Sequence, residues 1–78
     1  MLRIRITRRE AGSIPSEAVV TIPTSTGTEE VVVHASQATA DSVEAGFIGE
    51  KDDQVLVELP RETLSGRWRV WVPKTAIA

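Results

Sequence analysis

The chain of 78 residues contains no cysteine, and it has a single histidine, His34. Without thiols, neither disulfide bonds nor thiolate metal sites can support the fold. One histidine without spaced partners does not form the ligand clusters that hold metals. A Ser/His/Asp relay would have to be built on His34 and Asp41, and with only this one histidine to activate a hydroxyl we do not expect one. We therefore expect no catalytic residues, no metal and no cofactor.

Long apolar runs and a surplus of positive charge are also missing. No stretch approaches the ~18–20 apolar residues that a membrane-spanning helix needs, and the first residues, MLRIRITRRE, alternate charged and aliphatic side chains unlike a signal peptide. We expect a complete small protein with one domain over residues 1–78, located in the cytoplasm. The net charge of −2 disfavours bulk electrostatic binding to nucleic acid but leaves a local basic patch open.

The main pattern in the sequence is an alternation of apolar and polar residues, and this pattern predicts an all-β protein. Hydrophobic residues make up 41% of the chain, and many are the β-branched types that suit pleated strands. Residues 8–16 are interpreted as a loop and residues 50–53 as an acidic turn. Residues 36–42 are either a loop or one or two helical turns capped by Ser36. The six predicted strands span residues 2–7, 17–22, 29–35, 43–49, 54–59 and 67–72.

Two parts of the chain, residues 19–38 and 56–77, resemble each other. Each reads as a strand that ends at proline, a loop closed by glycine, and a second strand, and this order indicates an internal repeat. The alternative is chance, because any two hairpins punctuated by proline and glycine look alike. The matched positions are Val20 and Val57, Ile22 and Leu59, Pro23 and Pro60, Gly27 and Gly66, Val31 and Val70, and Val33 and Val72.

The repeat predicts which side chains point inward, and with them a small six-stranded β-barrel. The matched aliphatic residues would fill the interior, together with a second set given by alternation alone. That second set comprises Leu2, Ile4, Ile6, Phe47, Val55 and Trp68. The last residues, from Val70 to Ile77, resemble the end of an SH3-like barrel, in which a long strand is followed by a short turn and an aliphatic residue. The barrel is therefore either SH3-like or a pseudo-twofold pair of three-strand halves.

The same register leaves several large apolar side chains on the outside. Val19, Val32, Ile48 and Leu56 are the candidate oligomer contacts, with Trp71 beside them. Scattered exposed apolar residues are ordinary on protein surfaces, but this many on one small domain favour a contact surface. A homo-oligomer would cover this surface most simply and would add burial to a thin core, although a different protein partner is also possible.

The segment RWRVWVPK (residues 67–74) concentrates potential binding groups. Arg67, Arg69 and Trp71 share one predicted face, where guanidinium groups can hold an anion and an indole can stack on a base. Arg3 and Arg5 would join this candidate binding face if the first strand lay beside the last. The alternative is a solvated face whose arginines pair across strands with Glu44 or Glu58.

Three functions follow from these features. The preferred one is a non-enzymatic protein-interaction or assembly module that uses its outward apolar face. The alternative is binding of nucleic acid or an anionic ligand through the arginine and tryptophan face. An oligomeric enzyme with a pocket between subunits has no support in the sequence beyond the size of the chain.

Overall fold

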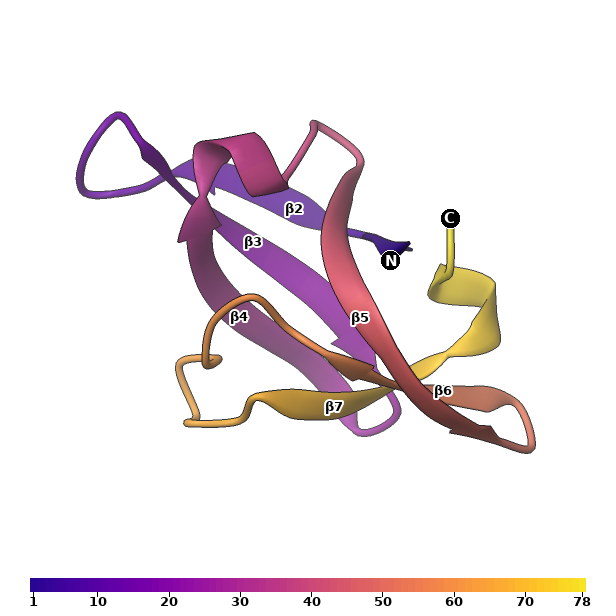
Figure 1. Cartoon of the computed structure of the whole chain (residues 1–78). Coiled ribbons are helices and arrows are strands. Elements are labelled where there is room, and N and C mark those ends of the chain that lie inside the picture. Colours follow the sequence, from indigo (N-terminus) through magenta and orange to yellow (C-terminus); the bar gives the residue numbers. More distant parts are fainter.

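The computed structural model describes all residues, Met1–Ala78, and its strands form two antiparallel sheets (Figure 1). The all-β class is confirmed. None of the helices has the length and apolar character required to cross a bilayer. The four-stranded sheet has the order β1 (Leu2–Arg5), β5 (Ser42–Lys51), β6 (Gln54–Glu58), β7 (Arg69–Pro73), and the three-stranded sheet has the order β2 (Arg8–Ala11), β3 (Glu17–Thr24), β4 (Gly27–His34).

The core lies between the sheets and takes side chains from both. All eight aliphatic residues matched by the repeat are buried, as predicted. Leu2, Ile6 and Ile77 are partly buried and pack against this core. Small alanines at Ala38, Ala45 and Ala76 complete it, and periodicity alone did not predict them. The cluster of 14 buried residues comprises Ile4, Val20, Ile22, Val31, Val33, Ala38, Val43, Ala45, Val55, Val57, Leu59, Val70, Val72 and Ala76.

The structure has seven strands where the sequence predicted six. The additional strand is β2, in a segment that was wrongly interpreted as a loop. All four of its residues are exposed, so no alternation of buried and exposed side chains marks it. Its backbone instead pairs with β3, from Arg8 opposite Thr21 to Ala11 opposite Ala18. A strand on a sheet edge with both faces in solvent leaves no hydrophobic period to detect.

Two aromatic residues predicted to point inward are exposed. Phe47, which is 56% exposed, pairs with buried Val57 near an irregularity in β5. The register with β6 shifts between Phe47 and Gly49, so the regular alternation of side chains is interrupted at this residue. Trp68, 52% exposed, precedes β7, so strand alternation does not reach it. Its carbonyl accepts a hydrogen bond from the Leu59 amide at 2.8 Å, which closes the loop between β6 and β7.

The ambiguous residues 36–42 begin with a single 3₁₀ turn, Ala35–Gln37. The His34 side chain, and not Ser36, caps this turn, because its ring nitrogen accepts from the Ser36 amide. The other boundaries move by a few residues. β3 continues through Pro23 to Thr24, and β5 begins at Ser42 and runs to Lys51, so the turn after it is shorter than predicted.

The order of elements recurs along the chain. Strands β3 and β4 are followed by the turn Ala35–Gln37, and strands β6 and β7 by the 3₁₀ turn Lys74–Ala76. After the first turn Ala38 bridges to Val43, and after the second Ile77 bridges to Ile4. Ile4 and Val43 also face each other where β1 pairs with β5. Each of the two segments matched in the sequence thus contains the same order of elements: two strands, a 3₁₀ turn and a residue that forms an isolated bridge.

Candidate binding surface around Trp71

The outer face of the four-stranded sheet carries Trp71 near the middle of β7. Val70 and Val72 on either side are buried, so alternation turns the Trp71 side chain outward, where it is half-buried. Leu56 of β6 lies directly across from Trp71, and Glu58 lies across from Arg69. The apolar pair of Leu56 and Trp71 is therefore followed along the same face by a charged pair.

Trp71 borders two depressions. The smaller one, of about 120 Å³, is also lined by Arg67, Arg69 and Glu29 and by the turn that joins β3 to β4. The larger one, of about 300 Å³, is also lined by Lys51, Asp52 and Gln54. In the smaller depression the Ser25 amide donates to the Trp71 carbonyl at 2.9 Å. This bond ties a turn of one sheet to a strand of the other, so both lining segments are held in place.

The charges around the smaller depression are partly neutralised. Arg69 Nε donates to Glu58 Oε2 at 3.0 Å, which is the cross-strand pairing considered as the alternative to a binding role. Glu29 accepts from the Ser65 hydroxyl at 2.7 Å. The Arg67 side chain, by contrast, makes no ion pair or side-chain hydrogen bond. Only the Arg67 backbone is engaged: its amide donates to Thr63 Oγ1, and its carbonyl accepts from the Thr63 amide at 2.9 Å. Arg67 is thus the unpaired cation of the smaller depression, and Lys51, which also forms no ion pair, is that of the larger one.

Arg3 and Arg5 do not lie beside this surface. β1 pairs with β5, and β6 stands between β5 and β7, so the strand order separates β1 from β7. Arg3 is bound to Ser42, whose hydroxyl accepts from Nε at 2.7 Å and whose carbonyl accepts from a terminal nitrogen at 3.3 Å. Arg5 donates to the Thr75 carbonyl at 3.1 Å. The structure therefore groups Arg67, Arg69 and Trp71 but not all five candidate residues.

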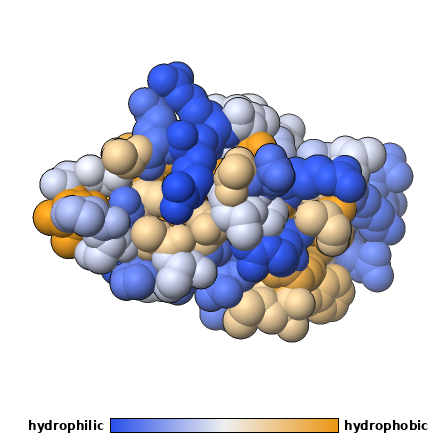
Figure 2. Space-filling model, turned by 90° about the horizontal axis from the view of Figure 1, so that it is seen from above, coloured by the Kyte–Doolittle hydropathy of each residue, from blue (hydrophilic) through white to orange (hydrophobic).

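The candidate oligomer contacts are divided between the two sheets and do not form a single surface patch. Val19 and Val32 face each other on β3 and β4 and are half-buried, as is Leu56 on β6. Ile48 on β5 is more open, at 39% exposure. In Figure 2 the apolar colour appears as separate patches within a mostly polar face. The sequence interpretation missed Phe47 as a surface residue, and its place next to Ile48 makes the end of β5 the most apolar exposed strand segment.

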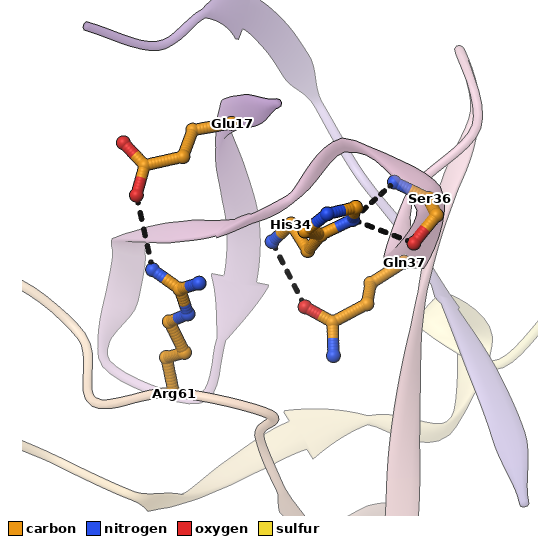
Figure 3. A network of polar contacts seen from close by, with 5 residues as sticks. All are labelled: Glu17, His34, Ser36, Gln37 and Arg61. Carbon is orange, nitrogen blue, oxygen red and sulfur yellow. Dashed lines mark hydrogen bonds and ion pairs between the residues drawn. The ribbon is translucent and has the colours of Figure 1, made fainter. Parts of the chain in front are cut away.

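His34 belongs to a local polar network and not to a site (Figure 3). Its Nδ1 accepts from the Ser36 amide at 3.2 Å and lies 2.7 Å from the Ser36 hydroxyl, while its own amide donates to Gln37 Oε1 at 2.9 Å. Nearby, Arg61 donates to Glu17 at 3.2 Å. No group of three or more histidine or acidic side chains converges as metal ligands would. The histidine fixes the end of β4.

Comparisons of the chain with protein-family models, with curated proteins and with solved structures found no match.

Proposed function

We propose that the domain is a non-enzymatic assembly module that associates with further copies of itself through outward apolar side chains. The observation that carries the proposal is the exposure of large hydrophobic residues, half of which lie at or beside one strand. Six large ones are exposed, and Met1, Phe47 and Ile48 among them lie at or beside β5. Large apolar side chains exposed on a small domain favour an interaction site.

The size of the core supports the same conclusion. Only 17 of the 78 residues are buried, the chain has no cysteine to form a disulfide, and no group of three or more side chains is placed to hold a metal. A domain of this length buries a smaller fraction of its surface than a larger one, and association is a common way to gain more burial. Self-association would thus stabilise the fold as well as build an assembly.

We further infer that the two sheets close into one barrel of two repeated halves. Its support is the set of backbone bonds that join β4 and the turn before it to β7 and the loop before it. Ser25 donates to Trp71 at 2.9 Å, and Leu64 donates to Glu30 at 2.9 Å, beside a bridge between Val31 and Thr63. Closure of this kind covers the edges of β4 and β7 and leaves the edge of β2 and the end of β5 open. The recurrence of strands, turn and bridge favours the pseudo-twofold form over the SH3-like one.

Sedimentation velocity over a wide range of protein concentration tests the assembly proposal. We expect the weight-average mass to rise from monomer towards a defined oligomer between about 10 µM and about 1 mM, the range in which small interfaces associate. A monomer mass throughout this range would overturn the proposal. Added salt should not weaken an association that depends on apolar contacts, whereas it would weaken an electrostatic one.

A second candidate function is binding of single-stranded nucleic acid, favoured by the convergence of Arg67, Arg69 and Trp71 on one depression. Its test is the fluorescence anisotropy of a labelled oligonucleotide at low salt, where phosphate contacts are strongest. We expect Arg67→Gln to weaken binding, while Arg8→Gln, which removes an exposed arginine on the other sheet, leaves it unchanged. No anisotropy change with the unaltered protein would exclude this function.

A further inference from the structure

The end of β5 has one backbone edge without a partner. β1 covers β5 from Ser42 to Ala45, and β6 pairs with the opposite edge from Gly46 to Lys51. None of the backbone hydrogen bonds outside the strand ladders involves residues 46–51. Along residues 47–51 the amide and carbonyl groups that point away from β6 therefore face solvent. Such an edge is a template for another strand.

The other outer edges of the four-stranded sheet are covered by the chain itself. On β1, the Arg3 carbonyl accepts from the Ala78 amide at 2.9 Å, and Ile77 bridges to Ile4. On β7, the Trp71 carbonyl accepts from Ser25. In the three-stranded sheet, residues 63–64 cover β4. These single bonds leave little room for a further strand.

The edge of β2 is open too, but it is protected in another way. That strand has four residues, RREA, and includes three charged side chains. Short, charged edges resist pairing with other strands. The open part of β5 is longer and carries Phe47 and Ile48, with exposures of 56% and 39%. Met1, 93% exposed, lines a depression of about 220 Å³ with Gly46 at the start of this segment.

Building on the proposed self-association, we infer that a second copy of the chain adds its own β5 to this edge in antiparallel orientation. The two four-stranded sheets would then continue into each other across a twofold axis, which is the usual symmetry of a homodimer. The open edge of β5 is limited by Met1, which lies beside Gly46, and by the turn that begins at Asp52. Residues 47–51 are therefore the segment of β5 that is free to pair with another strand. The one antiparallel pairing that matches this whole length with itself places Gly49 on the axis.

The side chains of the segment suit a second copy of itself. Pairing centred on Gly49 places Phe47 of each copy opposite Lys51 of the other, where an ammonium group can lie against the ring. Glu50 and Lys51 make the free segment neutral, so two copies do not repel each other. The short strand pairing buries less than the ~1,200 Å² of a standard interface, which implies a weak dimer with a Kd on the order of 0.1 mM.

Cross-linking tests this geometry directly, because the chain has no cysteine of its own. Antiparallel neighbours lie about 4.5–5.5 Å apart at Cα, within the span of a disulfide. We expect Gly49→Cys to form a covalent dimer rapidly on mild oxidation, and Arg9→Cys, at the open edge of β2, to form it at least tenfold more slowly. Equal rates for the two variants would overturn the inference.

A pair of surface substitutions separates this inference from the proposed function. We expect Phe47→Lys to raise the dimer Kd at least tenfold, because it puts positive charge opposite Lys51 and removes the ring. Leu64→Lys, at the most exposed leucine of the 59–68 loop, should leave the Kd unchanged. Association that is lost with Leu64→Lys but not with Phe47→Lys would overturn the β5 pairing and retain the assembly proposal. If the unaltered protein is strictly monomeric, both the β5 pairing and the assembly proposal are wrong.

Discussion

The two halves of the chain share a framework and differ at their edges. In residues 2–38 the hairpin strands β3 and β4 are 8 residues long each, whereas β6 and β7 in residues 42–77 have 5 each. The first half splits its leading strand into β1 and β2, while the second half keeps one strand, β5, of 10 residues. The open edge is charged in the first half and apolar in the second.

The comparison of the two halves distinguishes residues that are needed for packing from exposed residues that are available for binding. The inward aliphatic positions, the turns after each hairpin and their bridges recur in both halves, so packing accounts for them. Of the large exposed hydrophobic residues, Phe47, Ile48, Leu64 and Trp68 lie in the second half, whereas only Ile14 lies within residues 2–38. The loop of residues 59–68 that carries two of them replaces the tight turn between β3 and β4. The second half is therefore where we expect a partner to bind.

The largest expected effect comes from the matched core pair Ile22 and Leu59. Both are almost completely buried, so truncation removes transfer energy and leaves a cavity. We expect Ile22→Ala and Leu59→Ala each to lower the free energy of unfolding by about 2–5 kcal/mol. Urea denaturation followed by circular dichroism measures both. If one substitution costs little, the two halves do not contribute equally to one core.

The matched glycines Gly27 and Gly66 should give the next largest effect. Their φ angles are 141° and 85°, which side chains rarely adopt, although neither position is crowded. We expect Gly27→Ala and Gly66→Ala each to cost about 1–2 kcal/mol in unfolding free energy, from backbone strain alone. Gly46→Ala is the control, because its φ is not positive and its nearest contact is 3.9 Å away. A loss of similar size in the control would refute the conformational explanation.

Sequence periodicity predicted the core well because its signal is physical. Eight matched aliphatic residues are all buried, since a strand between core and solvent must alternate. The same reasoning failed at β2, where both faces meet solvent, and at Phe47, where a shift of register interrupts the alternation along β5. It could not detect the buried alanines either, because alanine is common on surfaces and in cores alike. Periodicity shows which face is buried, not where the burial ends.

The candidate site was predictable only in its local part. Arg69 and Trp71 share a face because they lie two residues apart on one strand, and the structure retains this. Whether Arg3 and Arg5 join them depends on strand order, which alternation does not encode. The open edge of β5 depends on where β1 stops, and the sequence shows no change of pattern there. Long-range pairing is the missing information in both cases.

The turn between β5 and β6 offers a smaller effect at Asp52. This residue has a positive φ of 55°, the only one outside glycine, whereas the β3–β4 turn uses Gly27. Asp52→Gly should therefore raise the free energy of unfolding by about 0.5 kcal/mol. The substitution relieves backbone strain in the folded state, and this gain slightly exceeds the cost of the greater conformational entropy that glycine gives the unfolded chain. Asp53→Gly, which relieves no strain, should lower stability instead. Thermal unfolding of both variants measures these changes in stability. A change of the same sign in both variants would contradict the explanation by backbone strain.

The smallest expected effect belongs to the ion pair that joins the halves. Arg61 in the second half donates to Glu17 in the first at 3.2 Å, and the side chains are 45% and 24% exposed. Solvent screens such a pair, so a double-mutant cycle with Arg61→Ala and Glu17→Ala should give a coupling of about 0.3 kcal/mol that vanishes in concentrated salt. The Arg69–Glu58 pair lies within one half, at 3.0 Å, and should give a similar value. A much larger coupling for Arg61 and Glu17 alone would mean that charges hold the halves together, whereas we attribute that to the shared aliphatic core.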